Sequence, residues 1–230
     1  MLHLRQTTVE ILRRNWRWRL AQFLEIRWWQ RYLRNKPTEQ YLADKRTYWK
    51  RVLQQLDYMP QPAEEALEVG CGPAGVFILL HDQQSFTAVD PLLKEYRERL
   101  SHFQPADYPT VEFQAQPLEK CELAAASFQV IYCFNAINHV SDWQGCLQLI
   151  TEAAAPGATL LLSSDVHRRS WLRSIFRLLP GDLLHPHQHL AGEYVDALEK
   201  LGWDINREAL LKPGRIFNYV GWVAKKKQGR

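Results

Sequence analysis

The chain has 230 residues, of which 46% are hydrophobic and 23% charged, and its formal net charge is +4. This balance predicts a folded globular protein and excludes a disordered one. The chain has no apolar run of the roughly 18–20 residues that a membrane span needs, and its four cysteines include no C-x-x-C pair, so we expect reduced thiols and neither structural zinc nor a disulfide framework.

The N-terminal segment carries the positive charge, because residues 1–36 hold nine Arg or Lys and two acids. Residues 9–56 have a helical pattern that is broken near Pro37. At about 100° per residue, the apolar positions form one stripe up to residue 25 and then move to Ile26, Trp29 and Leu33, nearly opposite. The pattern therefore predicts a bent or two-sided helical arm over residues 1–60 that packs partly on the body of the protein. Because the chain begins with mixed Arg and Trp rather than an apolar signal block, we expect it to stay in the cytoplasm.

After a short linker at residues 61–63, β-rich runs alternate with helical stretches, which is the pattern of a parallel α/β sheet. The β-rich runs cover 66–69, 86–89, 111–115, 128–134 and 158–163, and the helical stretches between them include 91–103 and 143–154. Near the end, 203–211 and 215–225 form the pattern of an antiparallel pair. The sequence therefore predicts five parallel strands and a terminal hairpin within one domain over residues 61–230.

A glycine-rich loop, LEVGCGPAG, follows the first β-rich run. Gly70, Gly72 and Gly75 fit the G-x-G-x-x-G pattern of a nucleotide-cofactor loop, in which glycines let the backbone approach the ligand closely. Asp90 ends the second run, where a carboxylate can accept hydrogen bonds from both ribose hydroxyls. Glu68 distinguishes between cofactors, since a carboxylate facing the site repels a pyrophosphate and suits the ammonium and sulfonium of S-adenosylmethionine. These residues favour S-adenosylmethionine over a dinucleotide, and a tight turn without a ligand is the third interpretation.

Over residues 60–225 the chain resembles the class I S-adenosylmethionine-dependent methyltransferases. The glycine loop resembles that family's first motif, AVDP at 88–91 its second, FQVIYCFN at 128–135 its fourth strand, and AAPGA at 154–158 the turn before its fifth. The chain departs from the family at Gln116, where an acid usually contacts the adenine, and at Gln129, where the fourth strand usually has Asp. The resemblance implies an α/β fold: a Rossmann-like seven-stranded, mostly parallel sheet in the order 3-2-1-4-5-7-6, with strand 7 antiparallel and an N-terminal helical cap.

The resemblance also implies where the cofactor binds, at the carboxyl ends of the first four strands. Glu68 and the 70–72 backbone would hold the methionine end, Asp90 the ribose and Gln116 the adenine. The predicted cofactor-binding residues are Glu68, Gly70, Cys71, Gly72, Asp90, Pro91, Gln116, Phe134 and Asn135.

Candidates for the acceptor pocket follow the fourth and fifth β-rich runs, beside the predicted donor methyl. Methyl transfer mainly requires positioning and the exclusion of water, and it needs a base only if the acceptor is protonated. The candidate bases are His139, His167 and His187, and the predicted pocket residues are Asn138, Asp165, His185, Trp29 and Tyr48. For each histidine a structural role is the competing interpretation. His185, His187 and His189 also suggest a metal, but no fourth ligand is apparent, so no metal is predicted.

The sequence thus predicts an S-adenosylmethionine-dependent methyltransferase. A Trp- and Tyr-rich arm over the acceptor pocket implies a small apolar or aromatic acceptor. The alternatives are a non-catalytic, membrane-associated binding module on the same fold, which the departures Gln116 and Gln129 favour, and a nicotinamide-dependent oxidoreductase. Arg mixed with Trp is also typical of interfacial helices, so residues 1–24 are candidates for peripheral contact with the inner face of a membrane. Nucleic acid is the least favoured partner.

Overall fold

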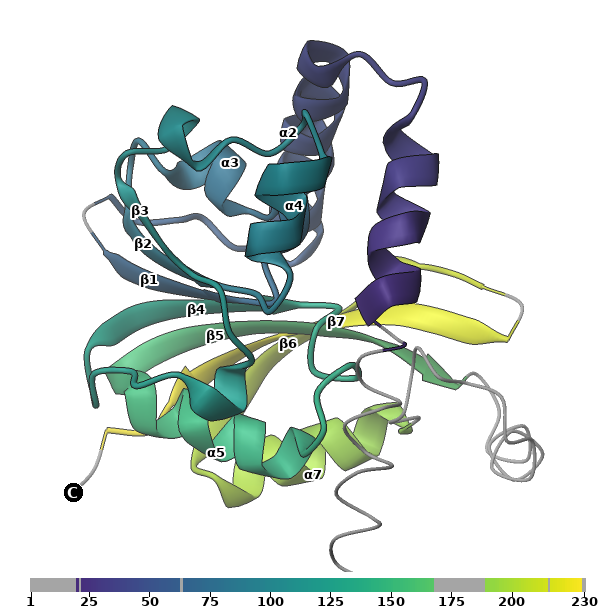
Figure 1. Ribbon diagram of the computed structural model, residues 1–230. Coiled ribbons are helices and arrows are strands. Elements are labelled where there is room, and N and C mark those ends of the chain that lie inside the picture. The colour runs from purple at the N-terminus through teal and green to yellow at the C-terminus, as the bar shows by residue number, and fades with distance from the viewer. Residues whose placement is uncertain (1–19, 21, 63, 168–188, 215, 229–230) are drawn as a thin grey trace, which may run out of the picture.

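Seven strands form one sheet in the order β3-β2-β1-β4-β5-β7-β6, as predicted (Figure 1). The computed structural model describes residues 20, 22–62, 64–167, 189–214 and 216–228. The strand β7 runs antiparallel to both of its neighbours, and the other pairs are parallel. The strands are β1 Glu65–Val69, β2 Ser85–Val89, β3 Val111–Gln114, β4 Phe128–Phe134, β5 Ala154–His167, β6 Trp203–Lys212 and β7 Phe217–Lys226.

The fifth strand is much longer than the six residues predicted. Its early part pairs Ala154 with Phe128 of β4, and after an irregularity the ladder resumes at Thr159. Its late part extends to His167 because β7 pairs with it as far as Phe217. Asp165 and His167, which were expected to follow this strand, therefore lie within it.

Two groups of helices cover the two faces of the sheet (Figure 1). The helices are α2 Thr38–Gln55, α3 Phe77–Leu80, α4 Leu93–Arg99, α5 Trp143–Ala153 and α7 Ala191–Lys200, and a further helix over residues 22–33 precedes α2. This N-terminal helix lies with α2, α3 and α4 on one face, and α5 and α7 lie on the other. The helix after β2 is shorter than predicted, because the backbone of Leu100 is extended.

Successive side chains of each strand point to opposite faces, so each face has its own hydrophobic core. Tyr132 of β4 belongs to the core that also contains Ile26 and Trp49 from the N-terminal helices. Its neighbour Cys133 belongs to the other core, with Leu147 of α5. The N-terminal helices therefore share a core with the sheet, and a domain boundary near residue 60 stays a prediction.

The N-terminal helix turns its predicted apolar stripe toward the sheet. Ile26 and Leu33 are buried, and Trp29 packs against the same core. Phe23 and Trp28 are about half exposed, at 48% and 54%. Residues 1–19 of the predicted arm lie outside the described residues. Within the described part of the chain, no helix is long and apolar enough to cross a membrane.

Candidate functional site

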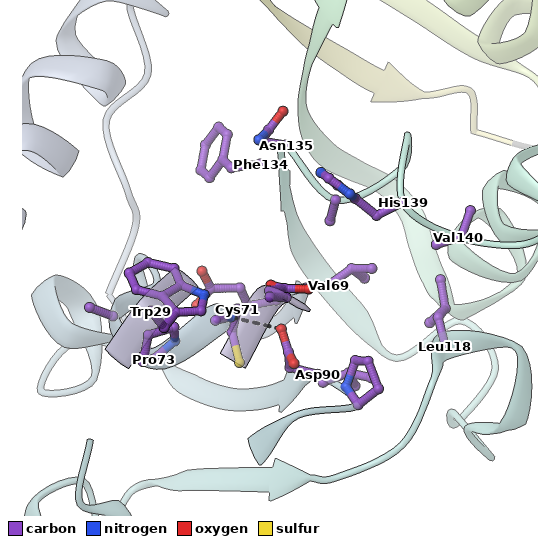
Figure 2. Close-up of a pocket in the computed structure, with 18 of the residues that line it drawn as sticks. Trp29, Val69, Cys71, Pro73, Asp90, Leu118, Phe134, Asn135, His139 and Val140 are labelled. Atoms are coloured by element: carbon purple, nitrogen blue, oxygen red, sulfur yellow. Dashed lines mark hydrogen bonds between the residues drawn. The ribbon is translucent and has the colours of Figure 1, made fainter. Parts of the chain in front are cut away.

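A cavity of about 710 Å³ opens at the carboxyl ends of β1, β2 and β4, where Val69, Val89 and Phe134 line it. Its volume lies in the roughly 300–1,000 Å³ range of small-molecule sites. The predicted site residues in its wall are Glu68, Gly70, Cys71, Gly72, Asp90, Pro91, Phe134, Asn135, His139, Asp165, Trp29 and Tyr48 (Figure 2). The structure therefore brings these predicted residues together around one cavity, and their roles in binding stay predictions.

Five predicted residues are not among those lining the cavity, and one of them, His167, is described with the other histidines below. Gln116 lies outside the lining, and its amide donates to Gln114 at 3.5 Å. Asn138 is 1% exposed because the chain turns into the core directly after Asn135. His185 and His187 lie outside the described residues.

The glycine loop forms the floor of the cavity. Gly70 and Gly72 have positive φ angles of 66° and 58°, a region that side chains disfavour. A Cβ on Gly70 would also overlap the Cβ of Ala136. The Gly70 amide donates to the carbonyl of Val89 at 2.8 Å. The loop is thus hydrogen-bonded to the end of β2. Because Gly70 and Gly72 have no side chains, a ligand in the cavity can approach their backbone closely.

The Glu68 carboxyl group fixes this loop by accepting hydrogen bonds from the backbone that follows it. Its Oε1 accepts from the Val76 amide at 2.6 Å and its Oε2 from the Phe77 amide at 2.9 Å. Burial raises the pKa of Glu68 to about 8, although the two amides act in the opposite direction. The expectation was a carboxylate that faces the cofactor. Instead, both oxygens already bond to backbone, because the short turn Gly72–Ala74 brings the following amides back to the end of β1.

Asp90 is oriented by two backbone amides and keeps acceptor capacity toward the cavity. Its Oδ2 accepts from Gly72 at 3.0 Å and its Oδ1 from Leu92 at 2.8 Å. A carboxylate has about four lone-pair sites, so each oxygen retains one. Two acceptors on one rigid group match the pair of hydroxyls of a ribose.

An acid from the N-terminal helix, Glu25, lies near Asp90. Tyr96 donates to Glu25 at 3.1 Å, and burial raises the pKa of Glu25. Burial first, and the Glu25 charge second, raise the pKa of Asp90 from its ordinary value of 3.8 to about 7. Glu25 was not predicted from the sequence, where its only signal was an acid within a basic arm.

The pKa of Asp90 has a consequence for stability. Because the folded protein holds this proton at a pH where the unfolded chain has released it, stability falls as pH rises from about 4 to about 7. A tenfold difference in proton affinity between the folded and unfolded chain corresponds to about 1.4 kcal/mol. We expect the ligand-free protein to lose stability over this interval in urea unfolding, and Asp90→Asn to lose less. Equal pH dependence in the two proteins would contradict the raised pKa.

Away from Asp90, the cavity wall is aromatic and lies beside Asn135. The φ of Asn135 is +52°, and its amide donates to the carbonyl of Ser163 at 3.0 Å. The Trp49 ring lies 5.1 Å from the Phe134 ring, and its Nε1 donates to Ala74 of the loop turn at 3.0 Å. Helix α2 is thereby connected to the glycine loop.

Next to these aromatic rings, the cavity wall carries hydroxyl groups. Tyr219 of β7 shares a hydrogen bond of 2.6 Å with Ser163, and its hydroxyl interacts with that of Tyr48. Burial raises the pKa of both tyrosines, so both stay neutral near pH 7. Tyr219 and Lys212 were not predicted from the sequence, because strand pairing rather than a local motif brings them to the cavity.

The candidate histidines separate into two groups. His139 lines the cavity (Figure 2). His167 does not line it, and its ring packs 4.6 Å from that of Phe217. His189 lies 3.6 Å from the Glu193 carboxylate and 4.4 Å from the Trp143 ring.

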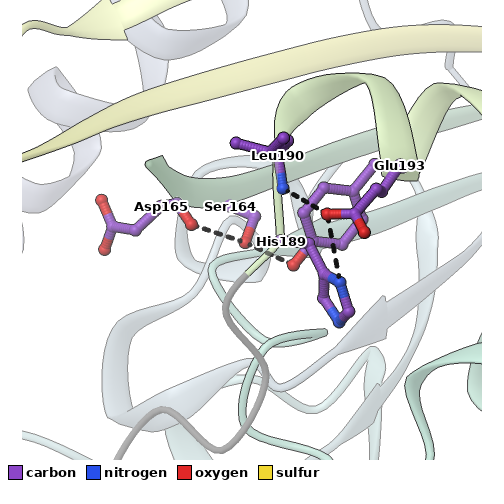
Figure 3. A network of polar contacts seen from close by, with 6 residues as sticks. Ser164, Asp165, His189, Leu190 and Glu193 are labelled. Carbon is purple, nitrogen blue, oxygen red and sulfur yellow. Dashed lines mark hydrogen bonds and ion pairs between the residues drawn. The ribbon is translucent and has the colours of Figure 1, made fainter. Parts of the chain in front are cut away.

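The contacts around His189 form a network at the start of α7 (Figure 3). Glu193 also accepts from the Leu190 amide at 2.8 Å, and Ser164 donates to Tyr194 at 3.1 Å. The carboxylate of Asp165 points away from this network. Among the described residues, no group of three His, Cys, Asp or Glu is placed to hold a metal.

Comparisons with known proteins agree with this arrangement. Residues 41–208 match the model of a methyltransferase domain, and the chain therefore belongs to that family of methyltransferases. A search of curated proteins finds no match.

Solved structures share the fold. An S-adenosylmethionine-dependent methyltransferase from Methanosarcina mazei is 16% identical, with a TM-score of 0.57 over 77% of this chain and 98% of its own. The 1,6-didemethyltoxoflavin-N1-methyltransferase of Burkholderia thailandensis, solved with its substrate and S-adenosylhomocysteine, is also 16% identical, with a TM-score of 0.55 over 81% and 79%. The [4+2]-cyclase SpnF is 15% identical, with a TM-score of 0.60 over 80% and 81%.

Proposed function

We propose that this protein transfers a methyl group from S-adenosylmethionine to a small apolar or aromatic acceptor. The observation that carries the proposal is the orientation of Asp90, which offers one acceptor position on each carboxylate oxygen beside the bare Gly70–Gly72 backbone. Membership in a methyltransferase family supports the same donor.

The donor is proposed to lie along the floor of the cavity. Asp90 accepts from the ribose hydroxyls, and the 70–72 backbone with Asn135 borders the methionine end. Pro91, which lines the cavity, is also proposed to contact the adenosyl group. For the adenine we propose contact with Leu118, which lines the cavity, in place of Gln116, which does not. Glu68 is proposed to contribute to donor binding indirectly, by fixing the position of the glycine loop.

Aromatic rings define the proposed acceptor side. The aromatic side chains in the wall are Trp28, Trp29, Tyr48, Trp49, Phe134 and Tyr219. Such a wall favours apolar or aromatic molecules, and its faces also stabilise a cation such as a sulfonium. An acceptor of this class is the one that the lining complements best.

The chain's residues would act mainly by positioning and by excluding water. S-adenosylmethionine supplies an activated methyl group on a sulfonium. Residues of the helix over 22–33 and of α2 line the cavity, and these two helices are proposed to limit its access to water. If the acceptor carries a proton at the reacting atom, His139 and Asp165 are the lining groups proposed to accept it.

A second candidate is a protein that keeps the fold without methyl transfer. The similarity to the [4+2]-cyclase SpnF favours including it, since that protein's name describes a different reaction. A membrane-associated binding module belongs to the same class, and contact through residues 1–24 stays a proposal that the exposed Phe23 and Leu24 support. Nicotinamide-dependent oxidation is the least supported alternative.

Transfer of a labelled methyl group tests the proposal. The protein is incubated with S-adenosylmethionine labelled in its methyl and the small-molecule fraction of a cell extract. We expect label in a small apolar product and S-adenosylhomocysteine in equal amount. Donor binding without any transfer would instead support the non-methylating candidate.

A further inference from the structure

A second cavity of about 340 Å³ adjoins the first, between one face of α2 and the hairpin of β6 and β7. Tyr48, Lys212 and Tyr219 belong to the walls of both cavities. Helix α2 contributes Arg51 and Gln55 one and two turns after Tyr48. Residues at this spacing share one face of a helix, so the same face of α2 borders both cavities.

Among the residues that the structure describes, two cations and no acid line the second cavity. Its lining is Tyr48, Arg51, Val52, Gln55, Leu211, Lys212, Pro213 and Tyr219. Within the described part of the chain, neither Arg51 nor Lys212 forms an ion pair. Asp165, the acid on this side of the main cavity, is not part of this lining. Two unpaired cations in a small concave space attract an anion.

Neutral hydroxyls mark the junction between the cavities. Tyr219 shares a hydrogen bond of 2.6 Å with Ser163, and its hydroxyl interacts with that of Tyr48. Both phenols line both cavities, and the Arg51 guanidinium lies 5.9 Å from the centre of the Tyr48 ring. A ligand that extends from the main cavity therefore meets hydroxyl groups first and the two cations next.

We propose that the second cavity binds a carboxylate or phosphate group of the acceptor through Arg51 and Lys212. The inference rests on the proposed function and narrows its acceptor to an aromatic or apolar molecule that carries an anionic group. Its reacting end lies in the main cavity, and its anionic end lies beyond Tyr48 and Tyr219. Arg can contact such a group through two parallel N–H bonds, whereas Lys acts as a point charge.

Calorimetry on the full chain saturated with S-adenosylhomocysteine tests this assignment. The probes are benzoate, its neutral analogue benzamide, and inorganic phosphate. We expect benzoate, phosphate or both to bind, and benzoate, if it binds, to bind at least about tenfold more tightly than benzamide, which is the effect of one charge-assisted contact. Whichever anion binds identifies the anionic group.

Variants assign the binding to the second cavity. Arg51→Gln and Lys212→Gln should each weaken anion binding about tenfold or more, and Arg51→Lys should restore part of it. The exposed Lys50, next to Arg51 and outside both linings, provides the matched control Lys50→Gln. The inference is overturned if neither anion binds, or if Arg51→Gln and Lys212→Gln leave the affinity unchanged. Failure of S-adenosylhomocysteine itself to bind would instead overturn the proposed function, so the two failures are distinct.

Discussion

Asp90→Ala is expected to abolish binding of S-adenosylmethionine and S-adenosylhomocysteine while the chain stays folded. The carboxylate is proposed to accept from two ribose hydroxyls, and it also orients the Gly72 amide of the loop. A hydrogen bond to a charged group contributes about 1.5–3 kcal/mol. Losing two such bonds should weaken binding by at least about a hundredfold, as measured by calorimetry.

Two controls make this result specific. Asp90→Asn keeps the shape and one acceptor oxygen, so we expect an intermediate loss. Asp196→Ala removes an exposed acid from α7, on the other face of the sheet, and should leave the affinity unchanged. Donor binding by Asp90→Ala at the wild-type affinity would show that the ribose lies elsewhere.

Glu68→Ala is expected to reduce both stability and donor binding. The substitution leaves the buried amides of Val76 and Phe77 without their acceptors. Each unsatisfied buried donor costs about 1–3 kcal/mol, partly offset because a buried carboxyl is removed. We expect a net loss of about 2–4 kcal/mol in urea unfolding, a large share of the typical 5–15 kcal/mol.

The combination of stability and binding distinguishes two roles for Glu68. Glu68→Gln keeps one acceptor oxygen, so it should lose about half as much stability. If Glu68→Ala unfolds at the wild-type urea concentration and loses only donor binding, the side chain contacts the donor directly. That outcome would contradict the loop-holding role and would restore the sequence-based interpretation.

The predictable part of the fold came from contiguous patterns. The bounds of β4 match the predicted 128–134, because an apolar run between turns is visible locally. The predicted fifth strand was too short, since Pro156-Gly157 has the pattern of a turn, yet the strand continues through it. The pairing that extends this strand beyond Ser163 comes from β7, 50 or more residues away, and no local pattern contains it.

The site residues divide in the same way, into those predictable from a contiguous motif and those that only tertiary packing brings to the cavity. The glycine loop and Asp90 were found because they end adjacent parallel strands within one motif. Gln116 was predicted from its place in the family pattern. The chain turns at that point, as its amide bonds the carbonyl of Gln114, and Leu118 reaches the cavity instead. Glu25 and Tyr219 reach the cavity through tertiary packing, which the sequence pattern does not encode locally.

The crevice above the glycine loop is proposed to bind an S-adenosyl group, and every other role assigned to the site depends on this. The most direct test is a calorimetric titration of the wild-type chain with S-adenosylhomocysteine and, separately, with NAD. We expect saturable binding of S-adenosylhomocysteine at one site per chain and none of NAD. Binding of NAD in its place, or of neither molecule, would contradict the proposal.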